Sequence, residues 1–495
     1  MKNSQSSYRH IMKATTLFGG VQVFQIIIRI IRSKFIAVLL GPTGMGIAGL
    51  LTSTTGLIGG LTNFGLGTSA VRNVASANST GNEIRIATVV IVLRRWVWGT
   101  GTLGAAVMLV LSPWLSQFTF GNHDYTLSFV WISITLLFAQ LSTGQLVILQ
   151  GMRKLQYLAK ANLAGSIIGL IITVPLYYLL GIKGIVPAII VTSVITLASS
   201  WYFAMKIKIK KVTVSKETTI AEGKEMLMMG FMISLSGLIT LGASYIVRIF
   251  ISNTGGIEQV GLYTAGFAIM NTYVGLIFTA MGTDYYPRLS AVSHSNELCK
   301  QTINQQAEIA LLILAPIIVV FLVFIKWVVI ILYSNKFTTI DPMIHWAALG
   351  MFFKSASWAI AFILLAKGSS KIFFWNELIA SIYMLGLNIL GYHFMGLTGL
   401  GISFMIGYLI YLVQVFVISK IKYQYSFNSA FIRIFIIQFL LATSCFIVVK
   451  FIGKPYLYIV GTGFILISAW YSYKELDKRL GIKLIFLNLK DRFSN

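Results

Sequence analysis

The sequence contains a long series of apolar runs of about 20 residues or more, separated by short polar segments. A helical run of this length matches the thickness of a bilayer's hydrocarbon core. Because hydrocarbon offers no partner to backbone polar groups, such runs must form helices. The runs fall at 14–40, 44–70, 86–111, 126–149, 157–180, 184–205, 226–251, 260–287, 305–332, 341–366, 372–393, 397–419, 430–450 and 455–473.

Composition agrees with a membrane protein, since 57% of the residues are hydrophobic and only 11% are charged. Ordinary soluble domains carry about 25% charged residues. We therefore predict an all-α polytopic membrane protein with about fourteen transmembrane helices. An even number of spans would place both termini on the same side.

The basic residues set the expected orientation. If the N-terminus is cytoplasmic, 26 of the 39 Lys and Arg residues fall in cytoplasmic segments. Only four fall in external loops: Lys183, Lys336, Lys450 and Lys454. The positive-inside rule then favours cytoplasmic termini. The net charge of +25 is explained by contact with anionic membrane lipids, so no nucleic-acid partner is expected.

The first half of the chain resembles the second half at one constant offset in sequence. Gly41 and Gly46 match Gly256 and Gly261, and further matches at the same offset join 166, 177, 181 and 184 to 381, 392, 396 and 399. We expect two pseudo-symmetric six-helix lobes around a central cavity. The predicted parts are an N-terminal lobe at 1–205, a basic cytoplasmic linker at 206–225, a C-terminal lobe at 226–420, and two additional helices with a basic cytoplasmic tail at 421–495.

The first apolar run carries a polar stripe. Gln22, Gln25, Arg29 and Arg32 follow one another at spacings of 3, 4 and 3, which places them on one helix face. Burying a cation in hydrocarbon costs roughly 2.5–3.5 kcal/mol even on lenient scales. The stripe therefore favours a wet cavity that binds an anionic substrate, with extension of the arginines to the membrane surface as the alternative.

Other cations lie within predicted spans and are further candidates for substrate binding: Arg94, Arg95, Arg248 and Lys354. Guanidinium groups match phosphate oxygens bidentately, so a pyrophosphate-linked lipid would suit such a set. Adjacent residues do not share a helix face, so at most one of Arg94 and Arg95 faces the substrate. Arg248 is equally compatible with an interfacial position.

Two acidic residues, Asp284 and Glu377, are candidates for coupling to H⁺ or Na⁺, or for ion pairs. The structural partners would be Arg288 for Asp284 and Lys354 for Glu377. The sequence has no phosphate-binding loop, no Ser–His–Asp arrangement and no histidine pair at metal-ligand spacing. We therefore expect no catalytic residues, no metal, no cofactor and no enzymatic activity, and transport driven by a gradient.

Several motifs resemble a known family. Residues 32–46, RSKFIAVLLGPTGMG, look like the first-helix signature of bacterial polysaccharide exporters in the multidrug/oligosaccharidyl-lipid/polysaccharide flippase superfamily. Residues 120–125, FGNHDY, and 334–338, SNKFT, resemble loops of the O-antigen translocases and of lipid III flippases of enterobacterial common antigen. Lys354 and Glu377 follow at the spacing of those proteins. The resemblance covers roughly residues 14–420.

The resemblance implies alternating-access flipping of an undecaprenyl-pyrophosphate-linked oligosaccharide, from the inner to the outer leaflet of the bacterial cytoplasmic membrane. Among the candidate residues, the positions that best match the functional residues of the family are Arg32, Lys354 and Glu377. The resemblance implies membrane lipids as partners. A polysaccharide polymerase and the chain-length machinery are further candidate partners. The alternatives are a cation-coupled multidrug exporter and, less favoured for lack of a long external loop, an O-antigen polymerase. The helices at 421–495 depart from the twelve-helix relatives and resemble additions found in peptidoglycan-precursor flippases.

Overall fold

The computed structural model describes residues 2–453 and 455–481, with residues 2–23, Thr283 and Leu480 given by their backbone only. The side chain of Gln22 therefore lies outside the described part. Every regular element in the described ranges is helical: α1 (Lys2–Thr62), α2 (Leu66–Ser79), α3 (Glu83–Phe120), α4 (Thr126–Gly151), α5 (Leu155–Leu180), η1 (Gly181–Gly184), α6 (Ile185–Met205), α7 (Lys216–Gly255), α8 (Ile257–Ala268), η2 (Ile269–Val274), α9 (Leu276–Ala291), α10 (Asn296–Leu332), η3 (Asn335–Ile340), α11 (Asp341–Ala366), α12 (Ser370–Tyr423), α13 (Ser429–Phe451) and α14 (Tyr456–Leu480).

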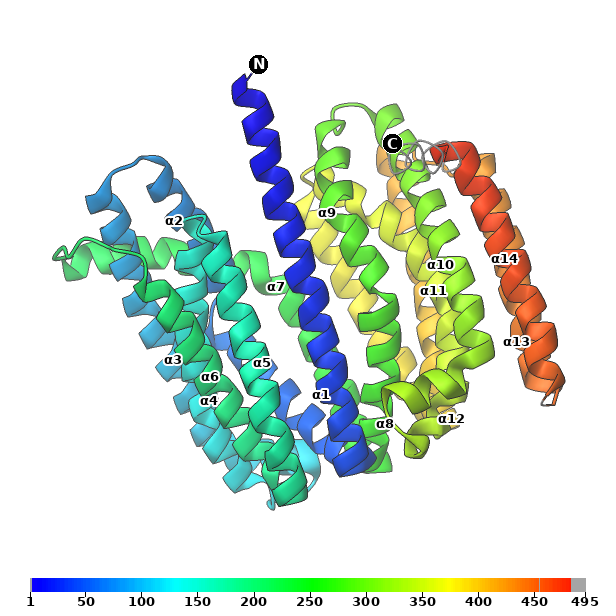
Figure 1. The fold of residues 1–495 in the computed structure, drawn as a ribbon, viewed down its shortest axis with the longest axis horizontal. Coiled ribbons are helices and arrows are strands. Elements are labelled where there is room, and N and C mark those ends of the chain that lie inside the picture. The colour runs from blue at the N-terminus through cyan, green and yellow to red at the C-terminus, as the bar shows by residue number, and fades with distance from the viewer. Residues whose placement is uncertain (1, 454, 482–495) are drawn as a thin grey trace, which may run out of the picture. The chain divides into compact units, whose positions relative to one another are not determined.

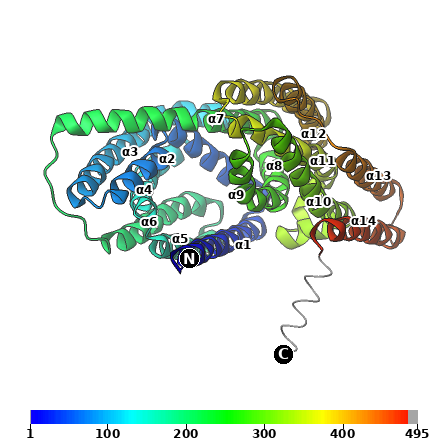
Figure 2. The ribbon, with the colours of Figure 1, turned by 90° about the horizontal axis from the view of Figure 1, so that it is seen from above.

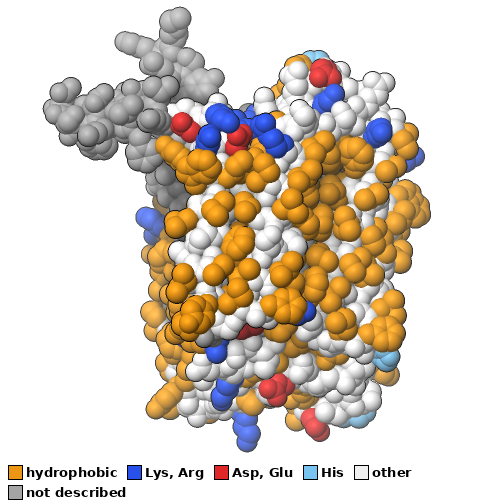
Figure 3. All heavy atoms as spheres, turned by 90° about the vertical axis from the view of Figure 1, so that its right-hand side faces the viewer, with side chains coloured by type: hydrophobic (Ala, Val, Ile, Leu, Met, Phe, Trp, Pro, Cys, Tyr) orange, Lys and Arg blue, Asp and Glu red, His pale blue; other side chains and the backbone are white. Residues whose placement is uncertain are grey.

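The helices have the length and surface of membrane spans. Among the described residues, ten helical stretches are long and apolar enough to cross a bilayer. Figure 3 shows a band of hydrophobic side chains on one face, with charged side chains gathered towards its two ends. This distribution is the one that a hydrocarbon core between two aqueous surfaces requires. The predicted all-α multi-pass fold is confirmed, while the count of fourteen spans stays a prediction.

The chain forms two compact units. Unit 1 comprises residues 1–262 and 332–334, and unit 2 comprises 263–331 and 335–495. In unit 1, α3, α4 and α6 pack side by side, and α7 packs on α1, α2 and α3 (Figures 1 and 2). The residues before α7 form no helix from 207 to 215, within the predicted linker. That a linker at 206–225 separates two six-helix lobes stays a prediction.

Unit 2 is centred on α11 and α12, which pack closely on each other, and α13 packs on α11 and α14 (Figure 2). The C-terminal end of α14 is fixed by buried charges. Arg479 Nε donates to Glu308 Oε2 on α10 over 2.6 Å, and Arg479 Nη1 lies 2.7 Å from Glu475 Oε2. Asn428 Nδ2 also donates to Glu308, over 2.8 Å. Because removing one partner from a buried ion pair is strongly destabilising, this cluster anchors the added helices to α10.

The internal repeat is visible in the backbone. Gly181 ends α5 at φ 57° and ψ −135°, and Gly396, its match in the second copy, interrupts α12 at φ 56° and ψ −139°. Gly41 and Gly256 form a second pair, at φ 66°, ψ −168° and φ 85°, ψ 169°. Side chains are rarely tolerated in these regions, which are essentially confined to glycine. The matched glycines therefore place equivalent turns in both copies.

A second consequence of the repeat is a close contact between two helix beginnings in unit 1. A Cβ on Gly46 would overlap the carbonyl oxygen of Ile257, and a Cβ on Gly261 would overlap that of Pro42. Under the repeat, Gly46 corresponds to Gly261 and Pro42 corresponds to Ile257, so the two contacts are equivalent. The two glycines therefore occupy equivalent, closely packed positions in the two copies.

One predicted span is wrong in detail, and a second continues through an irregular helical turn. The span at 44–70 is broken at 63–65, where Phe64 and Gly65 both adopt positive φ, and α2 begins afterwards. Gly65 packs directly against the backbone of Gly230 on α7, which leaves no room for a side chain. The span at 260–287 contains a π-helical turn, η2, before α9. Both segments carry a few polar residues within an apolar run, and mean hydropathy alone gives no sign of the loop at 63–65 or of the π-helical turn.

We predict that Gly261→Ala lowers the stability of the protein by about 1–3 kcal/mol, because the new methyl group forces two closely packed backbones apart. Thermal unfolding in detergent measures this. Gly99→Ala on α3 is the matched control, since nothing lies within 4 Å of its Cβ position. Equal stability of the two variants would contradict the claim that close backbone packing at Gly261 excludes a side chain.

Candidate functional site

Arg32 on α1 is one of the predicted first-helix residues whose side chains the structure describes. Its side chain is half-buried and lies along α5, where a Cβ on Gly169 would stand 3.2 Å from Nη2. The Nε atom is buried and has no hydrogen-bond partner among the described residues. A buried cationic donor without a partner is costly, so Arg32 is a good candidate to receive an anionic ligand. Arg29 is exposed and Gln25 is half-buried.

Arg94 and Arg95 on α3 point to different environments. Arg95 donates to the carbonyl oxygen of Val214 over 3.0 Å and to Thr219 Oγ1 over 2.5 Å, so it fastens α3 to the segment around the start of α7. Arg94 is exposed and forms no ion pair or hydrogen bond with the described residues. Arg94 is therefore the member of the pair that remains open to a ligand. Arg248 is half-buried and donates to Ser244, one turn earlier on α7.

Lys354 on α11 is the centre of a polar and aromatic cluster in unit 2. Its Nζ donates to Asn271 Oδ1, in the π-helical turn η2, over 2.7 Å. The same ammonium lies 5.1 Å from the ring centroid of Tyr408 and 5.6 Å from that of Phe404, both on α12. These distances suit cation–π attraction. Single π-helical turns are frequent at functional sites, because they redirect a side chain without ending the helix.

Glu377 continues this cluster along α12. Tyr411 Oη donates to Glu377 Oε1 over 2.5 Å, and Asn376 Nδ2 donates to the same oxygen over 3.1 Å. The rings of Tyr408 and Tyr411 are 6.3 Å apart at 90°, which links the Glu377 side of the cluster to the Lys354 side. In the described part of unit 2, Lys354 and Glu377 form no direct ion pair. The expected pairing of Lys354 with Glu377 is thus replaced by neutral partners for each.

Asp284 lies apart from this cluster. Its carboxylate is exposed and is 3.8 Å from Arg288 Nε, one turn later on α9. Arg288 also donates to Gln306 Oε1 over 2.6 Å. This arrangement is that of a structural ion pair. No group of three His, Cys, Asp or Glu residues within the described ranges is arranged to hold a metal ion.

Sequence reasoning missed the neutral members of the unit 2 cluster, which are Asn271, Asn376, Phe404, Tyr408 and Tyr411. Two signals were present. Asn271 is polar within an apolar span, and Tyr408 and Tyr411 are three residues apart, on one helix face. Aromatic residues are nonetheless common in any membrane helix, so the spacing alone does not distinguish a binding surface from packing.

Comparison with known proteins identifies the family. Residues 35–342, more than half of the chain, match the family described as polysaccharide biosynthesis protein. The chain belongs to this family. The membership confirms the resemblance given by the sequence motifs.

This polysaccharide biosynthesis protein is similar to curated flippases and transporters and to solved transporter structures. The lipid III flippase of Escherichia coli is 22% identical over 70% of this chain and 82% of its own length. A putative O-antigen transporter of Shigella flexneri is 25% identical over 68% of this chain and 80% of its own. The fold is similar to that of the lipid II flippase MurJ in an inward closed conformation, with a TM-score of 0.71 and 14% identity over 94% of this chain and 99% of that one. The fold is also similar to that of an inward-facing multidrug resistance transporter of the MATE family. The TM-score is 0.67 and the identity 15%, and the match covers 81% of this chain and 94% of that one.

We predict that Tyr411→Phe destabilises the protein by about 1.5–3 kcal/mol, because the half-buried Glu377 carboxylate loses a charge-assisted hydrogen bond from the buried Tyr411 hydroxyl. Tyr408→Phe is the control: it keeps the ring beside Lys354, and the hydrogen bond to Glu377 comes from Tyr411 instead. Thermal unfolding of the two purified variants tests this. A Tyr411→Phe protein as stable as Tyr408→Phe would show that the hydrogen bond has no net effect.

Proposed function

We propose that this protein is a flippase for an undecaprenyl-pyrophosphate-linked oligosaccharide, the repeat unit of O-antigen or a related surface polysaccharide. It would move this lipid by alternating access from the inner to the outer leaflet of the bacterial cytoplasmic membrane. Both termini would be cytoplasmic, in keeping with the distribution of Lys and Arg. The names of the curated relatives, a lipid III flippase and an O-antigen transporter, support this substrate class.

The observation that carries the proposal is the cluster around Lys354. One ammonium hydrogen bond goes to Asn271, and the remaining donors of this group are available for phosphate oxygens. The rings of Phe404 and Tyr408 offer apolar faces on which sugar rings can lie, and the Glu377 carboxylate can accept hydrogen bonds from hydroxyl groups. A cation, aromatic faces and a carboxylate in one cluster suit a phosphorylated sugar better than a simple hydrocarbon.

In unit 1, Arg32 is a second cationic residue for which we propose a role in substrate binding. Its half-buried guanidinium, whose Nε has no hydrogen-bond partner among the described residues, can bind a phosphate bidentately. We propose further roles in substrate binding for Gln22, Gln25, Arg29, Arg94 and Arg248, and a smaller one for Arg95 because the segment before α7 already engages it. Glu377 is the better candidate for coupling to H⁺ or Na⁺, since Asp284 is exposed and paired with Arg288.

The second candidate function is cation-coupled multidrug export, because the fold is also similar to a MATE transporter. Deleting the gene separates the two functions. If the protein is a flippase, spheroplasts of the deletion strain accumulate the lipid-linked repeat unit on the inner leaflet and lose surface polysaccharide. Normal polysaccharide with increased drug sensitivity would instead favour the exporter. Single repeat units on the outer leaflet would indicate a polymerase.

We predict that Arg32→Ala abolishes most complementation of the deletion strain while the protein still inserts in the membrane. The loss of a charged hydrogen-bonding group corresponds to a reduction of about tenfold to one-hundredfold. Lys326→Ala on α10 removes an exposed cation and should complement normally. Normal surface polysaccharide with Arg32→Ala would exclude Arg32 from the substrate path.

Lys354→Met should reduce export by a similar factor, because methionine keeps the length of the side chain but neither its charge nor its hydrogen bond to Asn271. Lys354→Arg retains a cation and should export more than Lys354→Met does. Lys371→Met, which removes an exposed lysine at the start of α12, is the matched control. Equal export by Lys354→Met and Lys371→Met would contradict the proposed role.

A further inference from the structure

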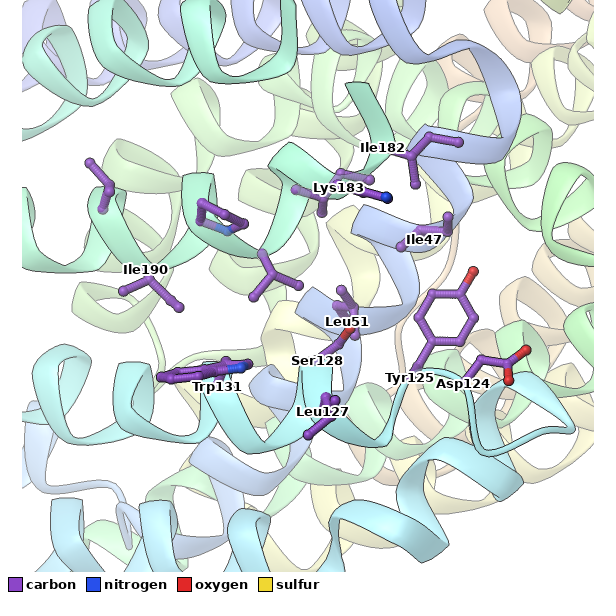
Figure 4. A pocket seen from close by; sticks show the side chains of 14 residues that line it. Ile47, Leu51, Asp124, Tyr125, Leu127, Ser128, Trp131, Ile182, Lys183 and Ile190 are labelled. Carbon is purple, nitrogen blue, oxygen red and sulfur yellow. The ribbon is translucent and has the colours of Figure 1, made fainter. Parts of the chain in front are cut away.

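Unit 1 contains a cavity that the proposed transport function does not use. It has a volume of about 620 Å³ and lies among the second half of α1, the beginning of α4, η1 and the beginning of α6 (Figure 4). Most of the side chains around it are aliphatic, among them Leu51, Val186 and Ile190. Trp131 is 64% exposed, although it lies in an apolar helix. An open, apolar cavity in a membrane-spanning unit is accessible to lipid chains.

Two opposite charges lie at this cavity. Asp124 comes from the loop before α4, and Lys183 comes from η1. Both side chains are exposed, and neither forms an ion pair with the other or with another described residue. In the view of Figure 4, the Tyr125 ring lies between them. A ligand that presents one positive and one negative group could satisfy both.

Tyr125 is held in place at the edge of this cavity. Its ring stacks on Phe120 with a centroid distance of 3.8 Å, and its backbone N–H donates to Ser116 Oγ over 3.2 Å. Burial, and then the neighbouring Asp124 carboxylate, raise the pKa of Tyr125 above its ordinary value. The phenol is therefore neutral at physiological pH and can donate a hydrogen bond to a ligand oxygen.

We propose that this cavity binds an aminophospholipid such as phosphatidylethanolamine. Lys183 would contact the phosphate, Asp124 the ammonium group, and the apolar side chains around Trp131 an acyl chain. Tryptophan suits this position, because its ring is apolar and its N–H is polar, as at membrane interfaces generally. An anionic lipid without an amine would leave Asp124 unpaired, and a diphosphate-linked lipid would add repulsion with its second negative group. The charges thus favour a zwitterionic lipid over the proposed transport substrate.

Photocrosslinking of the full-length protein in vesicles tests the site. The probes are phosphatidylethanolamine and phosphatidylglycerol with a photoreactive group on the acyl chain, and mass spectrometry locates the label. We expect labelling of the Trp131 and Val191 peptides by phosphatidylethanolamine, about threefold to fivefold above phosphatidylglycerol, as suits an exposed ion pair. Asp124→Asn should remove this preference, and Lys183→Ala should lower labelling by both lipids. Lys336→Ala, which removes an exposed lysine of η3 in unit 2, should change neither.

Three results would overturn the proposal. In the first, neither lipid labels the Trp131 and Val191 peptides. In the second, both lipids label the wild-type protein equally. In the third, a polyprenyl diphosphate displaces the probe at a lower concentration than unlabelled phosphatidylethanolamine does. The last result would assign the cavity to the transport substrate. Because the readout is lipid labelling, it does not depend on whether the protein is a flippase.

Discussion

The structure depends on one constraint, which is that hydrocarbon offers no hydrogen-bond partner to a peptide group. Within apolar spans the chain is therefore helical, and each break needs a local reason. Four breaks occur in pairs, at Gly41 with Gly256 and at Gly181 with Gly396, with nearly the same backbone angles in each pair. These paired breaks belong to the architecture, since each copy of the repeat needs the same turn.

Other features occur in only one copy of the repeat, and these lie in the polar and aromatic cluster. The π-helical turn at 269–274 corresponds to 54–59 in the first copy, which lies in regular α-helix. Its Asn271 holds Lys354, and the first-copy counterpart of Lys354 is Ala139. Glu377 likewise corresponds to Asn162. The second copy thus departs from the repeat at residues that form its polar and aromatic cluster.

Much of the fold could be predicted from the sequence, because span length and glycine placement each follow from strong physical rules. The glycines that match between the two copies identified turns whose backbone only glycine adopts readily. The break at 63–65 could not be predicted, since it depends on how closely Gly65 approaches Gly230 on a helix far along the chain. The hydrogen-bond partners of Lys354 and Glu377 could not be predicted either. The sequence singled out Lys354 and Glu377, but only the structure shows that Asn271 and Tyr411 bind them.

The central claim is that this member of the polysaccharide biosynthesis protein family moves a lipid-linked oligosaccharide across a bilayer. The most direct test places the purified protein in proteoliposomes whose inner leaflet contains a fluorescent polyprenyl-diphosphate oligosaccharide. A glycosidase added outside then reports how much sugar reaches the outer leaflet. The account predicts cleavage of sugar from the inner pool with the protein and almost none in protein-free liposomes. Equal protection of the inner pool in both preparations, with an imposed proton or sodium gradient of either sign, would contradict it.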